Sequence, residues 1–225
     1  PTSKMAHAYL TIGEDTLTIH ADFEYVKGFG DHYLSEPSVM MRANSGLFDI
    51  NLDVTNLSHA QAMPLQYMCH MNYAYAKNAH IEQNLPDEAF ELRQTVPAHV
   101  HPTDAWLAYN DQLKASGELI NDLTDEAHYD PEIVFFSRDL TQYTDEAEFR
   151  MHLDDSHNFL TKFKTEQFPI VTRWLLYNAD QQVAAFALPG TSTPEGKAAA
   201  TKAGTLIMLE PQAKRHFSVT TGLEK

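Results

Sequence analysis

Residues 47–55 read Leu-Phe-Asp-Ile-Asn-Leu-Asp-Val-Thr, and this stretch decides the fold class. Four apolar side chains alternate with four polar ones: Phe48, Ile50, Leu52 and Val54 against Asp49, Asn51, Asp53 and Thr55. Successive side chains point to opposite faces of a strand. The period of two therefore predicts a β-strand with one face on a core and the other in water.

Similar patterns recur on both sides of this strand. They predict further strands at residues 8–12, 17–25, 38–42, 65–73, 149–153, 170–177, 183–188, 206–210 and 216–221. Turn-forming residues separate several of them, at 12–15, 44–46 and 177–180, which is typical of hairpins between antiparallel neighbours. We therefore expect an all-β fold.

Helical segments are few. Pro194 to Lys202 is predicted as one short helix, with Thr193 as its N-cap, and it ends before Gly204. A further helical turn is expected within residues 104–113. It lies in a long irregular stretch from about 85 to 130, and loops of that length commonly carry or cover a functional site.

The composition indicates one folded domain over residues 1–225. Hydrophobic residues make up 43% of the chain and charged residues 21%, which is enough apolar material for a sizeable core. The formal net charge of -15 repels phosphate backbones and anionic lipids, so we expect neither nucleic acid nor a membrane as a partner. The single cysteine, Cys69, cannot form an internal disulfide, and a cytoplasmic location fits best.

The segment most informative about function is residues 64–73, Pro-Leu-Gln-Tyr-Met-Cys-His-Met-Asn-Tyr. If it is extended, one face carries Gln66, Met68, His70 and Asn72, and this polar row could line a pocket. Cys69 then points to the opposite face from His70, which argues against a cysteine–histidine nucleophile pair. Without a family resemblance, a hydrogen-bonded core histidine is the commoner role for such a residue.

Four segments, in order, carry a family resemblance. Residues 52–57 followed by 63–73, then 134–140, 168–174 and 194–197 resemble the aldose 1-epimerase (galactose mutarotase-like) superfamily, especially its uncharacterised epimerase-like branch. In that branch, a strand ending in Val-Thr-Asn leads to Pro-Leu or Pro-Met and then to a His-x-Asn-Phe or His-x-Asn-Tyr strand.

The resemblance implies a large twisted antiparallel β-sandwich, the supersandwich, whose concave face holds a monosaccharide. It places His70 as the general acid toward the ring oxygen, since an imidazole side chain, with an ordinary pKa of about 6.5, donates and recovers protons around neutrality. The polar row makes Asn72 and Gln66 substrate-binding candidates. The resemblance adds Arg173 and Trp174, because the corresponding strand of the family approaches the sugar site. For the last two, the alternative is that Trp174 packs in the core and Arg173 pairs with a surface acid.

The general base is where the sequence departs from the family. The family places a glutamate in a Leu-Glu-Pro segment, whereas this chain reads Ala187-Leu188-Pro189, so Leu188 occupies the expected glutamate position. Two alternatives follow. Glu195, the nearest carboxylate in the sequence, serves as a second catalytic residue, or the protein is a sugar-binding or sensing module without mutarotation.

The same resemblance covers only the C-terminal two thirds of such proteins. We therefore expect that N-terminal strands are supplied elsewhere, and that the chain forms a homo-oligomer or associates with the missing half, because open sheet edges invite pairing. The monosaccharide is the expected ligand, with no cofactor. His99 and His101 place two imidazoles on one side of an extended segment, with Asp104 close by, which makes a metal site conceivable. No third ligand accompanies the two histidines at a familiar spacing, and chance pairing is the simpler interpretation. We expect no metal.

Overall fold

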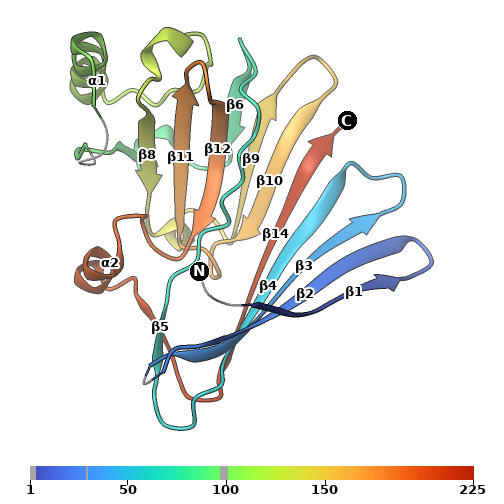
Figure 1. Cartoon of the computed structure of the whole chain (residues 1–225). Helices are drawn as coiled ribbons and strands as arrows, with labels where there is room; N and C mark the ends of the chain where they lie inside the picture. Colours follow the sequence, from blue (N-terminus) through green and yellow to red (C-terminus); the bar gives the residue numbers. More distant parts are fainter. Residues whose placement is uncertain (1–3, 29, 97–100) are drawn as a thin grey trace.

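The computed structural model describes residues 4–28, 30–96 and 101–225, and antiparallel strands dominate it (Figure 1). The larger sheet has eight strands in the order β1-β2-β3-β4-β14-β10-β9-β6. Their bounds are Lys4–Ile12 (β1), Thr16–Val26 (β2), His32–Arg42 (β3), Leu47–Asn56 (β4), Lys214–Glu224 (β14), Asn158–Lys164 (β10), Glu146–His152 (β9) and His80–Gln83 (β6). The all-β prediction is confirmed, and the strand expected at residues 47–55 is β4.

A smaller sheet packs against part of the larger one. Its order is β12-β11-β8-β7, with bounds Gln182–Gly190 (β12), Ile170–Tyr177 (β11), Ile133–Ser137 (β8) and Phe90–Leu92 (β7). A two-stranded ladder pairs β13 (Ile207–Leu209) with β5 (Met63–Leu65). The helices are α1 (Asp104–Ser116) and α2 (Lys197–Ala203), with 3-10 turns at Asp87–Ala89, Glu126–His128 and Leu140–Gln142.

The core lies between the two sheets. Strand β9 shows how the sequence builds it, because Ala147, Phe149 and Met151 are fully buried while the residues between them are half-buried. Phe163 of β10 stacks on Phe149 with ring centroids 6.1 Å apart. From the smaller sheet, the core receives fully buried side chains such as Leu175. Burial of these apolar side chains is the main stabilising term of the sandwich.

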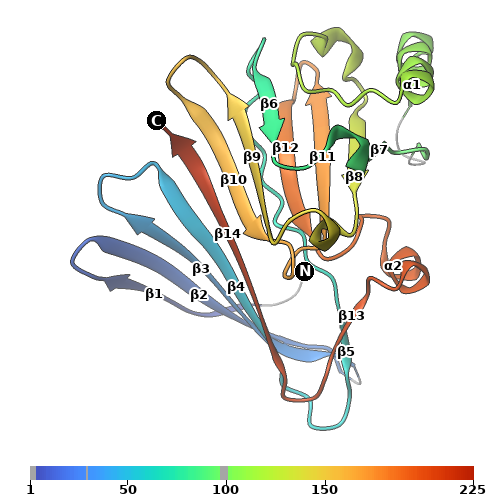
Figure 2. The same ribbon diagram turned by 180° about the vertical axis from the view of Figure 1, so that it is seen from behind.

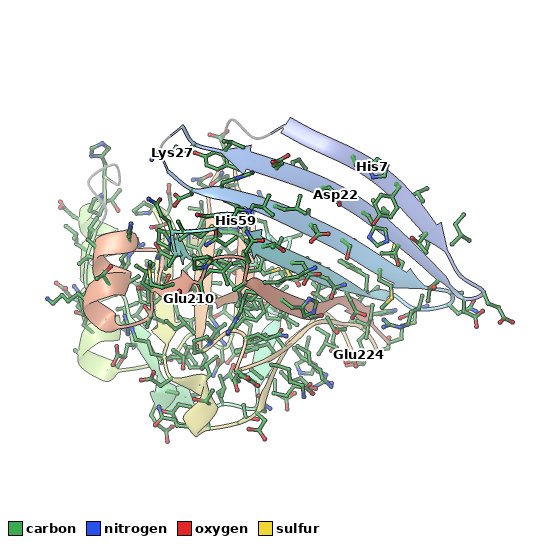
Figure 3. All side chains as sticks on the ribbon, turned by 90° about the horizontal axis from the view of Figure 1, so that it is seen from below. His7, Asp22, Lys27, His59, Glu210 and Glu224 are labelled. Carbon is green, nitrogen blue, oxygen red and sulfur yellow. The ribbon has the colours of Figure 1, made fainter. Side chains whose placement is uncertain are left out.

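Strands β1, β2 and β3 form a part of the larger sheet that we call the wing. In Figures 1 and 2 the wing fans away from the smaller sheet, and Figure 3 shows it extending beyond the rest of the molecule. The hairpin turns expected at residues 12–15 and 44–46 join β1 to β2 and β3 to β4. The wing therefore continues the larger sheet past the region that the smaller sheet covers.

Three local predictions need correction. Helix α2 begins at Lys197, three residues later than expected, with Gly196 rather than Thr193 as its N-cap; its end before Gly204 is confirmed. The expected turn at 104–113 is the longer helix α1, capped by the hydroxyl of Thr103. The strand expected at residues 65–73 is regular only to Leu65, and the patterns above do not predict strands β6, β7, β8 and β10.

Candidate functional site

An irregular segment, residues 66–75, runs antiparallel beside strand β12. The Cys69 amide donates to the carbonyl of Pro189 at 2.9 Å, and the Thr191 amide donates to the carbonyl of Tyr67 at 2.9 Å. Further along, the Tyr75 amide donates to the carbonyl of Gln182 at 3.0 Å. Residues 66–75 therefore act as an additional, interrupted strand at the edge of the smaller sheet.

Side chains alternate along this segment. Cys69 is 4% exposed, and burial raises the pKa of its thiol. Tyr73 also points inward, where its hydroxyl lies 2.9 Å from the hydroxyl of Thr161 on β10. Gln66, His70 and Asn72 are exposed. The polar row expected on one face is therefore present even though the hydrogen bonding is too sparse for a regular strand.

A cleft of about 290 Å³ opens beside His70, and we call it the His70 cleft. Its apolar lining comes from Met68, Val134, Leu188 and Pro194, and its polar and aromatic lining from His70, Arg93, Glu132, Thr172 and Trp174. These side chains come from segment 66–75, from strands β8, β11 and β12, and from the loop after β12. Arg93 directly follows β7, and Glu132 directly precedes β8. The site is thus built on the outer face of the smaller sheet, away from the sandwich core.

Glu132 is the carboxylate that lines this cleft. One of its oxygens accepts a hydrogen bond from Arg93 Nη2 at 2.6 Å, and the other accepts one from Trp174 Nε1 at 2.6 Å. The Glu132 and Arg93 side chains are only 16% and 14% exposed. The backbone carbonyl of Glu132 also accepts from the indole of Trp106 at 3.1 Å. The carboxylate is held in one orientation by donors on both sides, and each oxygen keeps a lone pair for a ligand hydroxyl.

The indole of Trp174 joins Glu132 to His70. The His70 and Trp174 ring centroids lie 5.6 Å apart at an interplanar angle of 68°, an edge-on arrangement. Beside them, the Thr172 hydroxyl is buried and has no hydrogen-bond partner among the described residues. A buried hydroxyl without a partner costs free energy unless water or a ligand satisfies it. The cleft therefore combines an imidazole, a carboxylate and an indole, a set of groups suited to a polyhydroxylated ligand, and the buried Thr172 hydroxyl lies beside them.

Leu188 and Glu195 fall in different places. Leu188 lines the His70 cleft and is 1% exposed, so the position where the family resemblance expects a glutamate does adjoin His70. Glu195 is exposed, accepts a hydrogen bond from the Thr193 hydroxyl at 3.0 Å and does not line the cleft. It is Glu132, rather than Glu195, that shares the hollow with the imidazole.

A second hollow, of about 270 Å³, adjoins the first and shares Met68 and Pro194 with it. Gln66 lines this second hollow, where its Nε2 donates to the Ser192 hydroxyl at 2.7 Å. Asn72 lies in the same exposed row as His70 but lines neither hollow. The structure thus brings Gln66, His70 and Trp174 to one continuous surface and leaves Asn72 beyond it.

Arg173 lies on the opposite face of β11 from Trp174, inside the sandwich. It is fully buried, and its guanidinium donates to the carbonyl of Ile120 at 2.6 Å, to Asn121 Oδ1 at 2.8 Å and to Gln83 Oε1 at 2.7 Å. Burial lowers the pKa of this guanidinium to about 9. Because its donors are committed to protein acceptors in the core, Arg173 is placed as a structural residue rather than a hydroxyl-binding group. Within the described part of the chain, its hydrogen bonds include no surface acid either.

The two remaining sequence features bear on metals and membranes. Among the described residues, no three histidine, cysteine or acidic side chains come together as a metal site. The His99-Val100-His101 motif falls partly on residues 97–100, outside the described part of the chain. Within residues 4–28, 30–96 and 101–225, no helix combines the length and apolar character needed to cross a membrane.

Sequence reasoning missed Arg93, Glu132 and Thr172. Glu132 follows Pro131 and stands two residues before segment 134–140, which carried part of the family resemblance, so its position next to that segment was an available signal. Arg93 comes from the irregular stretch 85–130, where no periodicity points to a site. Thr172 is the residue before Arg173, and strand alternation alone places it with Trp174 on the cleft side.

Comparisons with known proteins now bear on this geometry. No family model matches the sequence, and no curated protein does either. Solved structures do match. A candidate aldose 1-epimerase from Klebsiella pneumoniae is 15% identical with a TM-score of 0.71, and the match covers 96% of this chain and 53% of that chain.

Two further solved structures agree. A galactose mutarotase-like protein from Clostridium acetobutylicum is 14% identical, with a TM-score of 0.62 over 99% of this chain and 66% of that one. A galactose mutarotase related enzyme from Lactobacillus acidophilus is 12% identical, with a TM-score of 0.60 over 98% of this chain and 72% of that one. The chain thus spans between about half and three quarters of these proteins. It has the galactose mutarotase-like fold.

Proposed function

We propose that the His70 cleft binds a monosaccharide in its cyclic form and interconverts the two anomers. The observation that carries this proposal is the placement of an imidazole and an oriented carboxylate in one hollow of about 290 Å³, beside an indole. A hollow of this volume lies at the lower end of the range for small-molecule sites. Solved proteins with this fold bear the names aldose 1-epimerase or galactose mutarotase-like protein, which supports the same ligand class.

The reaction needs an acid and a base on the same sugar. In the proposed step, Glu132 accepts the proton of the anomeric hydroxyl while protonated His70 donates a proton to the ring oxygen, and the bond between the anomeric carbon and the ring oxygen breaks. Rotation of the resulting aldehyde exposes its other face. Ring closure then returns both protons to the groups that supplied them, so the enzyme ends unchanged. The indole of Trp174 packs against the sugar and holds it in place.

A second candidate function is sugar binding without catalysis. Two observations favour it: Leu188 lines the cleft where the resemblance expects a carboxylate, and both Glu132 oxygens already accept hydrogen bonds. Donors to a carboxylate stabilise its ionised form and so weaken it as a base. In this reading Glu132 binds sugar hydroxyls, and His70 forms part of the same binding surface.

One experiment separates the two functions. Calorimetry against hexoses and pentoses measures binding, and saturation-transfer NMR or polarimetry measures anomer interconversion, for the native protein and for His70→Ala. His59→Ala is the matched control, since His59 is exposed and lines neither hollow. We expect binding in all three proteins and a rate at least about 100-fold lower in His70→Ala alone. Binding without any acceleration selects the second candidate, and equal rates in native protein and His70→Ala remove the acid role of His70.

A further inference from the structure

One face of the wing is apolar, and its side chains become more exposed from each strand to the next, toward β1. Residues directly opposite one another form a row from Leu10 to Ile19, Val39, Ile50 and Val219. Val219 is 1% exposed in the core, whereas Ile19 is 46% and Leu10 59% exposed. The row belongs to one face of one sheet, so the same apolar surface begins in the core and ends in water.

The neighbouring row behaves in the same way. It runs from Ile12 through Leu17 and Met41 to Phe48, and Ile12 is 78% exposed. An apolar sheet face normally packs on a second layer. A contiguous exposed apolar patch of this kind marks an interaction surface.

The total exposed surface supports this view. The chain exposes 12345 Å², whereas a compact monomer of its mass, 25.4 kDa, exposes roughly 10,300 Å². The excess, about 2,000 Å², is more than the roughly 800 Å² that each partner contributes to a stable interface. One chain therefore carries enough additional surface for a specific contact.

Two open strand edges flank the uncovered face. Within the described residues, strand β1 ends the larger sheet and pairs only with β2. Segment 66–75 borders the smaller sheet, where Met68 lies opposite Gly190 and Ala74 lies opposite Val183. The hydrogen bonds to β12 at these two places are formed by the residues before and after Met68 and Ala74, not by Met68 and Ala74 themselves. In this antiparallel pattern, the amide and carbonyl groups of Met68 and Ala74 point away from β12. Both edges thus present backbone groups that a further strand can bond.

We propose that a second copy of this chain covers the wing, with the two apolar wing faces stacked on each other across a two-fold axis. In this arrangement the wing of each copy extends the smaller sheet of the other, and β1 of one copy pairs with segment 66–75 of the other. One contact therefore covers both apolar wing faces, and in each copy it pairs both the β1 edge and the edge of segment 66–75. Such self-complementarity is the property of an isologous interface.

The pairing also bears on the ligand site, a point that rests on the proposed function, whereas the pairing itself does not. The polar face of β1 carries His7 and Tyr9, and Tyr9 stacks between His7 and His20 with centroid distances of 4.9 Å and 4.4 Å. Asp22 lies 3.6 Å from His7 on the neighbouring strand (Figure 3). Pairing of β1 with segment 66–75 places this aromatic stack beside the row that contains His70 in the other copy, as an extension of its sugar-binding surface.

Sedimentation analysis of the native protein tests the pairing. We expect a dimer of twice 25.4 kDa, and a dissociation constant raised about 100-fold or more by Leu10→Asp, because a buried unpaired carboxylate opposes association. Thr11→Asp is the matched control, since Thr11 lies next to Leu10 on the opposite, polar face, where its hydroxyl is within hydrogen-bond distance of His20 Nε2, at 3.1 Å. It should leave the dimer intact.

Hydrogen exchange of the Met68 and Ala74 amides provides a second measurement that needs no variant. These amides should be protected in concentrated native protein and exchange rapidly after dilution to monomer. A native protein that sediments as a monomer at every concentration overturns the proposal, as does a dimer unaffected by Leu10→Asp. Fast exchange of both amides in an established dimer rules out the edge pairing.

Discussion

Replacement of Glu132 by glutamine tests whether the carboxylate organises the His70 cleft. The amide has the shape of the carboxylate but presents one oxygen and one NH₂ group. Because Arg93 and Trp174 both donate to Glu132, the NH₂ group of the glutamine must face one of these donors. The substitution therefore removes one hydrogen bond outright and takes the negative charge from the other.

The magnitude follows from burial. Hydrogen bonds to a charged group contribute about 1.5–3 kcal/mol each, and with Glu132 and Arg93 only 16% and 14% exposed, solvent screens the pair weakly. We expect Glu132→Gln to lose about 2 kcal/mol of unfolding free energy, which corresponds to about 4–8 °C in Tm for a chain of this length. A similar loss for each sugar hydroxyl that the carboxylate accepts weakens binding by about 10–100-fold.

Thermal unfolding followed by circular dichroism, together with calorimetric titration of sugars, measures both effects. The control is Glu91→Gln, which breaks a pair with Arg138 of the same 2.6 Å length but with Glu91 74% exposed, so its cost should stay below about 0.5 kcal/mol. If Glu132→Gln changed stability and affinity no more than Glu91→Gln, the carboxylate would not hold the cleft together, and the inference from its burial would be wrong.

Two further predictions concern the base position and alkaline pH. Leu188→Glu introduces a carboxylate beside His70, and we expect faster anomer interconversion, measured by NMR. Because Leu188 is buried, the substitution should also lower the free energy of unfolding by several kcal/mol. An unchanged rate in a folded variant would exclude this position as the base. Burial raises the pKa of Tyr67, Tyr73 and Tyr129, and that of Tyr109 to about 12. The folded state keeps these phenols protonated, whereas in the unfolded chain they ionise above a pH of about 10. The free energy of unfolding is therefore unaffected below a pH of about 10. It falls as the pH rises above that value, by up to about 1.4 kcal/mol per pH unit for the fully buried Tyr129. Urea unfolding between about pH 9 and 12 measures this loss, and constant stability would contradict it.

Most of the longer strands were readable from the sequence because apolar, β-branched and aromatic residues gather in them and turn-forming residues separate several of them. Strand β11 has the bounds that the pattern predicts, and β2, β12 and β14 differ by one to three residues at either end. Three of the four missed strands are short. Strand β8, Ile-Val-Phe-Phe-Ser, is buried on both faces and shows no alternation, and β6 and β7 are only four and three residues long. Short or fully buried strands are determined by tertiary packing rather than by local pattern.

Of the residues that line the site, the sequence pattern predicted only those that lie on a single extended segment. Alternation along residues 66–73 separates the exposed row of His70 from the buried side of Cys69, and the structure agrees. Glu132 and Arg93 reach the same cleft from segments about 60 and 20 residues away, through strand order that no local pattern encodes. The placement of Arg173 in the core depends on its acceptors in Gln83, Ile120 and Asn121, which lie 90, 53 and 52 residues before it in the chain.

The two faces of strand β11 therefore have different roles, one in the interior of the sandwich and the other in the His70 cleft. Arg173 donates hydrogen bonds to residues 120 and 121 inside the sandwich, while its neighbour Trp174 lines the His70 cleft. A deletion of one residue upstream within this strand would exchange the two faces, since side-chain direction reverses at every position. A guanidinium would then occupy the ligand site and an indole the polar interior, so insertions and deletions in β11 should be tolerated far less than substitutions.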